Sequence, residues 1–212
     1  MVISALVFAL FILPTWSQEQ TVQGPWGYTN QNDWPPICVT GRRQSPIAIN
    51  TYEAMYDQSL NNLRFLNWKL NINGSLENPG NQGITWKADP SYEDTRLPKF
   101  VGGGLSGEYV LRAIHFRWAL SDCDGSDHYI DYKPTPLEIQ IQTQKIIRED
   151  NEEDDQTNPE LAYDAMAFFS YMFEYDEKPN EQFQPLFAAV EKVILGASRC
   201  NLNYQLLTFF FT

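Results

Sequence analysis

Two segments of the chain alternate between polar and apolar side chains with a period of two, the pattern of a half-buried β-strand. The first segment places His115 and Arg117 on one face and apolar residues on the other. The second carries four polar residues on one face: Glu138, Gln140, Gln142 and Gln144. Two such strands can direct their polar faces into one cleft, although strands with one solvated face and one core face give the same alternation.

Three further segments have patterns that predict local structure. Residues 184–197 place apolar side chains at helical spacing and reach Gly196 near their end, which predicts an amphipathic surface helix. Residues 161–175 are mainly apolar, and their period alone does not distinguish a helix from a strand. Residues 102–109 are rich in glycine and predict a turn, because the Lys-Ser/Thr pair of a phosphate-binding loop and a following helical pattern are both absent.

The first 17 residues have the pattern of a secretory leader. They contain no charged residue, and the apolar run at 2–13 is too short to cross a bilayer. Thr15 and Ser17 satisfy the small-residue rule, so we expect cleavage after Ser17, with an uncleaved anchor as the alternative. The sequence therefore predicts a leader at 1–17, one domain at 18–212, and a secreted, extracellular protein with no membrane association after cleavage.

The net charge limits the classes of partner. The 212 residues carry a formal charge of −12 at pH 7, which disfavours nucleic acid and anionic lipid as partners. An acidic run at 150–155 contributes to this charge, and we expect it to be a solvated loop because burying several like charges is costly. A calcium site is the alternative there, but the run lacks glycine and EF-hand spacing.

The cysteines and one sequence triplet bear on modification in an extracellular protein. Cys38, Cys123 and Cys200 allow one disulfide and one remaining thiol. Cys38 can be free, pair with Cys123 or Cys200, or pair with another chain, and the sequence does not choose between these alternatives. Asn73-Gly74-Ser75 is an acceptor triplet for N-glycosylation, so Asn73 is a candidate site in a glycoprotein.

Four motifs follow one another in an order that points to a family. They are Arg-Gln-Ser-Pro-Ile-Ala-Ile at 43–49, Ile-His-Phe-Arg-Trp at 114–118, Gly-Ser-Asp-His-Tyr at 125–129 and Leu-Glu-Ile-Gln-Ile at 137–141. With these motifs the chain resembles the α-class carbonic anhydrases from about residue 26 to residue 207. The resemblance implies a mainly β (α+β) fold, with a large twisted, mostly antiparallel central sheet and short peripheral helices. It also makes 161–175 a central strand and places the last strands of the family's fold beyond Thr212.

The resemblance also assigns roles to single residues. In that family three histidines hold a catalytic zinc ion, and His115 falls on the first of them, Arg117 on the second and Gln140 on the third. Glu138 falls on the carboxylate that orients the third ligand, and Asn81 on the histidine that carries protons to solvent. Only His115 remains as a metal ligand, and Asn81 cannot titrate near neutral pH.

These replacements remove the groups that the family's reaction needs. Zinc takes ligands with a free lone pair, whereas Arg117 is always cationic and offers none, and Gln140 is a poor ligand beside imidazole. His115 and His128 are the only histidines in the chain, so three histidines cannot be assembled. We therefore expect no cofactor, and we hypothesise that the Arg117 guanidinium occupies the zinc position and pairs with Glu138.

The resemblance and the replaced ligands together imply a secreted α-carbonic anhydrase-like protein that is catalytically inactive and acts as a binding or interaction module. Its partner would be an unidentified protein or a small anion bound at Arg117. One alternative is a zinc-dependent carbonate dehydratase, catalysing reversible CO2 hydration, in which acidic residues replace the missing ligands. The other is a nonfunctional truncated fragment, since the sequence does not establish that Thr212 is the true C-terminus.

Overall fold

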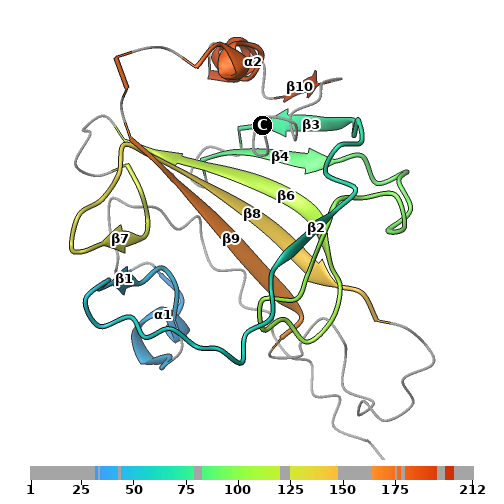
Figure 1. Cartoon of the computed structure of the whole chain (residues 1–212). Coiled ribbons are helices and arrows are strands. Elements are labelled where there is room, and N and C mark those ends of the chain that lie inside the picture. The colour runs from blue at the N-terminus through green and yellow to red at the C-terminus, as the bar shows by residue number, and fades with distance from the viewer. Residues whose placement is uncertain are drawn as a thin grey trace, which may run out of the picture.

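A large antiparallel sheet forms the centre of the molecule (Figure 1). The computed structural model describes residues 32, 34–42, 44–78, 83–119, 125–147, 164–174, 176–177, 180–194 and 199–202. Among these residues the sheet has eight strands, and every neighbouring pair is antiparallel. The strands are β2 (Arg64–Leu66), β3 (Gly74–Glu77), β4 (Ile84–Ala88), β5 (Lys99–Val101), β6 (Tyr109–Trp118), β8 (Leu137–Lys145), β9 (Met166–Phe173) and β10 (Arg199–Leu202).

Smaller elements lie around this sheet. β1 (Ala48–Ile49) and β7 (Tyr129–Ile130) form a separate parallel pair. The helices in the described part are α1 (Ile37–Thr40), the 3-10 helix η3 (Glu181–Phe183) and α2 (Gln184–Ile194), with α2 beside β10 and β3 in Figure 1. None of the described helices has the length and apolar character needed to span a bilayer.

Two rows of apolar side chains cross the strands and form the core face of the sheet. The rows are Ile84–Phe116–Ile139 and Trp86–Ile114–Ile141. All six side chains are buried, and the same cluster includes Leu186 and Val193 from α2. Because each fully buried apolar side chain of this size contributes roughly 1.5–3 kcal/mol, these rows hold β4, β6 and β8 in one register.

The intervening residues of the same strands form the opposite, polar face. Thr85, His115 and Gln140 are aligned across β4, β6 and β8, and Arg117 and Glu138 face each other in the next row. A one-residue slip would move these polar side chains into the core, so the apolar rows also fix where the polar residues lie.

The predicted mainly β fold with a mostly antiparallel sheet is confirmed. The apolar segment at 161–175 contains strand β9, but among the described strands β9 pairs with β8 alone and so lies at an edge of the sheet instead of at the expected central position. The predicted helix begins at Gln184 as α2. The glycine-rich turn precedes β6, and Gly102, Gly103 and Gly104 all have positive φ, a conformation that favours glycine.

Several predictions fall on residues outside the described part. These are the leader at 1–17, the acidic run at 150–155, Asn81 and Cys123. Cys38 is an exposed free thiol, and Cys200 lies on β10, where only the backbone is described. The pairing of the cysteines therefore stays open.

Candidate functional site

The His115 side chain is held on both of its ring nitrogens. Nδ1 lies 3.0 Å from Thr85 Oγ1, and Nε2 lies 2.8 Å from Gln142 Oε1. Burial lowers the pKa of His115, and the Arg117 charge lowers it further, against the opposite effect of the Gln142 hydrogen bond. The ring is therefore neutral near pH 7. Since Gln142 Oε1 only accepts, His115 Nε2 carries the proton and Nδ1 accepts the Thr85 hydroxyl.

The Phe168 ring stacks on the face of the His115 ring. The two rings are stacked with their centroids 6.3 Å apart, and Phe168 lies beside Gln142 in the register of β8 and β9. The amide nitrogen of Gln142 in turn lies 3.7 Å from the sulfur of Met166. His115 therefore has no nitrogen lone pair directed to a ligand.

Arg117 forms an ion pair with Asp127 and not the predicted pair with Glu138. Its Nε lies 3.1 Å from Asp127 Oδ2, and the same oxygen accepts a hydrogen bond of 3.0 Å from Gln140 Nε2. The pairing with Glu138 was wrong because both oxygens of that carboxylate accept hydrogen bonds from other donors. The guanidinium does lie on the cleft face, next to Gly83, where a Cβ would stand 3.0 Å from Arg117 Nη1.

Glu138 is completely buried and binds the turn that carries Asp127. Its Oε2 accepts the backbone N–H groups of Asp127 and His128 at 2.8 and 2.9 Å. Its Oε1 lies 2.7 Å from His128 Nδ1 and accepts Gln140 Nε2 at 3.0 Å. Burial raises the pKa of Glu138, but hydrogen bonds from Ser170, His128 and Gln140 outweigh this effect and leave the pKa below its ordinary value. Glu138 is therefore an anion that fastens the turn to the sheet.

The residues at the three inferred ligand positions do not fit a zinc ion. Both nitrogens of His115 are engaged, Arg117 is cationic, and Gln140 directs its amide N–H groups at Asp127 and Glu138. Over the described ranges no group of three or more His, Cys, Asp and Glu residues could hold a metal ion.

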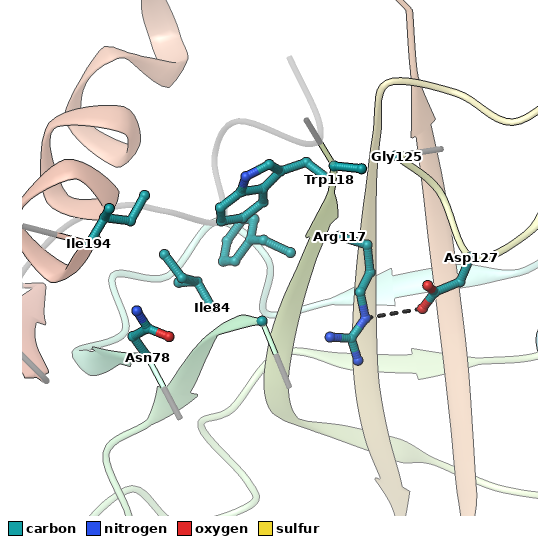
Figure 2. A pocket seen from close by; sticks show the side chains of 10 residues that line it. Asn78, Ile84, Arg117, Trp118, Gly125, Asp127 and Ile194 are labelled. Carbon is teal, nitrogen blue, oxygen red and sulfur yellow. Dashed lines mark ion pairs between the residues drawn. The ribbon is translucent and has the colours of Figure 1, made fainter. Parts of the chain in front are cut away.

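A cavity of about 490 Å³ opens beside this network (Figure 2). Arg117 and Asp127 lie on one side of it, and Trp118, Ile84 and Ile194 lie on the other. The cavity thus combines one ion pair with a mainly apolar wall that includes Asn78, and it is large enough for a small organic molecule.

Sequence reasoning missed Asp127 and Gln142. Asp127 belongs to the Gly-Ser-Asp-His-Tyr motif, and an acidic residue two positions before a strand-forming tyrosine was the available signal. Gln142 continues the polar face of β8 two residues after Gln140, and its contact with His115 follows from the diagonal neighbours in adjacent strands.

The candidate glycosylation residue Asn73 is exposed and lies immediately before β3, a position that an acceptor asparagine requires.

Comparisons with known proteins agree with the resemblance. A family model described as eukaryotic-type carbonic anhydrase matches residues 29–209. Putative carbonic anhydrase 3 of Caenorhabditis elegans is 30% identical over 128 residues, which are 58% of this chain and 49% of that protein. Carbonic anhydrase 4 of Oryctolagus cuniculus is 28% identical over 169 residues, covering 80% of this chain and 51% of the relative. Carbonic anhydrase 7 of Homo sapiens is 35% identical over 123 residues, which are 55% of this chain and 44% of that protein. The chain spans about half the length of the curated relatives it matches.

Proposed function

This chain belongs to the eukaryotic-type carbonic anhydrase family, and we propose that it is a member without carbonic anhydrase activity that works as a binding module. Its relatives are named carbonic anhydrases. That activity needs a zinc ion held by ligands, and the described residues of this cleft do not offer such a set. The proposal therefore separates membership of the family from the family's reaction.

The ion pair between Arg117 and Asp127 is the observation that carries the proposal. It places a fixed positive charge and its counter-ion where the resemblance locates the second zinc ligand. A divalent cation 4 Å from the Arg117 charge would be repelled by about 8 kcal/mol at an effective dielectric constant of 20, twice the value for two unit charges. Gln140 reinforces the pair by donating to Asp127, so the cleft is stabilised in a form that excludes the ion.

We further propose that the protein is secreted after removal of residues 1–17 and glycosylated at Asn73. The leader pattern and the surface position of Asn73 support this. The strongly negative charge makes nucleic acid a poor partner, and the ligand we propose is a protein or a small anion bound locally at Arg117.

The test uses the full chain, expressed with its leader and purified from the medium. Zinc content is measured by mass spectrometry after dialysis against a zinc buffer, and CO2 hydration is followed by stopped flow, with carbonic anhydrase 7 of Homo sapiens as the active control. We expect far less than one zinc per chain and no hydration above the buffer rate. One zinc per chain together with measurable hydration would overturn the proposal in favour of an enzyme with unusual ligands.

A further inference from the structure

The cavity beside Arg117 has two chemically different sides. Arg117 and Asp127 supply charged groups on one side, where Arg117 Nε lies 3.1 Å from Asp127 Oδ2 and a Cβ at Gly83 would stand 3.0 Å from Arg117 Nη1. The Arg117 side chain is only 19% exposed, so its charge is partly desolvated. A charge-assisted hydrogen bond made here is stronger than the same bond on an open surface.

The other side is mainly apolar and is built from the start of β4, the end of β6 and the end of α2, with Asn78 as its polar member. Ile84 and Phe116 are almost completely buried beneath the cavity. Trp118 and Ile194 stand at its rim, where they remain 43% and 54% exposed (Figure 2). Large apolar side chains at this exposure, around a hollow, lose contact with water when a ligand with an apolar body enters.

We propose that this cavity binds a small organic carboxylate, with the carboxylate on the Arg117 guanidinium and the apolar body between Trp118 and Ile194. The inference rests on the proposed function, because a zinc ion bound beside Arg117 would change the charge of the site. The guanidinium of arginine has a planar set of N–H donors that matches the two oxygens of a carboxylate. An aromatic ligand body can stack on the indole of Trp118. The volume of about 490 Å³ lies within the range of small-molecule sites.

Asp127 orients the guanidinium through one of its two carboxylate oxygens. Its Oδ2 receives both the Arg117 ion pair and the Gln140 amide, which leaves the other faces of the guanidinium toward the cavity that both residues line. The ion pair also holds Arg117 in one rotamer before binding, which reduces the entropy that a ligand must overcome.

The experiment compares 2-naphthoate with its neutral isostere 2-naphthamide, by titration calorimetry on the metal-free full chain. We expect 1:1 binding of naphthoate, at least about tenfold tighter than naphthamide, the value of one additional charge-assisted hydrogen bond. Acetate, which has the same carboxylate group but no aromatic ring, should bind too weakly to detect. Equal affinities for naphthoate and naphthamide, or binding of acetate as tight as that of naphthoate, would overturn the assignment.

Variants locate the binding in this cavity. Arg117→Gln should reduce naphthoate affinity to that of naphthamide, whereas the matched control Arg112→Gln should leave it unchanged. Arg112 lies on the same strand and pairs with Asp94, but it does not line the cavity. Trp118→Ala should weaken both ligands by a similar factor. Unchanged binding in Arg117→Gln refutes the site, and if that variant does not fold, unchanged binding in Trp118→Ala refutes it instead.

The outcomes separate this inference from the proposed function. Zinc-free, inactive protein that fails to bind naphthoate overturns the carboxylate site alone. Protein that takes up one zinc per chain and hydrates CO2 overturns the proposed function, whatever it binds in this cavity.

Discussion

Asp127 lies 3.1 Å from the Nε of Arg117, although Arg117 faces Glu138 directly in the register of β6 and β8. Glu138 is not the counter-ion because it accepts the backbone N–H groups of Asp127 and His128. These two hydrogen bonds hold the turn against the sheet and thereby deliver the Asp127 carboxylate to Arg117. Glu138 therefore neutralises Arg117 indirectly, by positioning the residue that does so.

Removing the charge of Glu138 should destabilise the fold and make the free energy of unfolding less sensitive to acidic pH. Glu138→Gln leaves backbone donors facing an amide, and we expect a loss of about 2 kcal/mol in the free energy of unfolding, measured with urea. In the unmodified protein the folded-state pKa lies below the ordinary value of 4.5, so the unfolded chain binds more protons as the pH falls below about 4.5. That part of the stability is present above pH 4.5 and is lost on acidification.

The pH series distinguishes this role from simple packing. Glu138→Gln should show a smaller loss of stability between pH 5 and pH 3 than the unmodified protein, while Glu108→Gln serves as the control for a more exposed ion pair with Lys99. An unchanged acid profile in Glu138→Gln would contradict the assignment of an ionised, buried carboxylate.

Arg117 and Asp127 should be energetically coupled. Arg117→Gln leaves the Asp127 carboxylate without its ion pair, and Asp127→Asn leaves the guanidinium without its counter-ion, so each single change should cost about 1 kcal/mol for this partly exposed pair. The double variant should cost less than the sum of the two. Additive losses in urea unfolding would mean that the ion pair contributes nothing. The same cycle on Arg112 and Asp94, a more exposed pair, should give a smaller coupling energy.

His115 should titrate at a lower pH than a free histidine. Because burial lowers its folded-state pKa below 6.5, the unfolded chain takes up the proton first, and stability falls as the pH drops below 6.5. Histidine NMR signals, assigned with His115→Gln and His128→Gln variants, measure the pKa directly. We expect His115→Gln to reduce the difference in Tm between pH 7.5 and pH 5.5, and a His115 pKa at or above 6.5 would rule this interpretation out.

The polar face of the site could be predicted from the sequence, whereas its pairings could not. Alternation along a strand is a local property, so His115 and Arg117 were assigned to one face correctly. The partner of Arg117 depends on how the turn before β7 folds back over β8, and the buried Glu138 decides this through contacts ten and eleven residues away in the chain. Glu138 is the carboxylate opposite Arg117 in the strand register, but the backbone N–H groups of Asp127 and His128 compete for it, and strand alternation does not reveal them.

Restoring the two missing histidines should not by itself restore a good zinc site. Arg117→His with Gln140→His supplies three imidazoles on adjoining strands, but Gln142 still accepts the proton on Nε2 of His115. We therefore expect weak zinc binding in this double variant, measured by competition with a fluorescent chelator. Adding Gln142→Ala removes that acceptor and should tighten zinc binding at least about tenfold, since one more ligand nitrogen becomes available.

The control places two histidines at the other end of the same strands. Arg112→His with Gln144→His replaces another pair joined across β6 and β8, at 2.9 Å, where the resemblance locates no ligand. It should not bind zinc more tightly than the unmodified protein. If Gln142→Ala leaves the zinc affinity of the double variant unchanged, the hydrogen bond between Gln142 and His115 is not what withholds the remaining histidine from the metal.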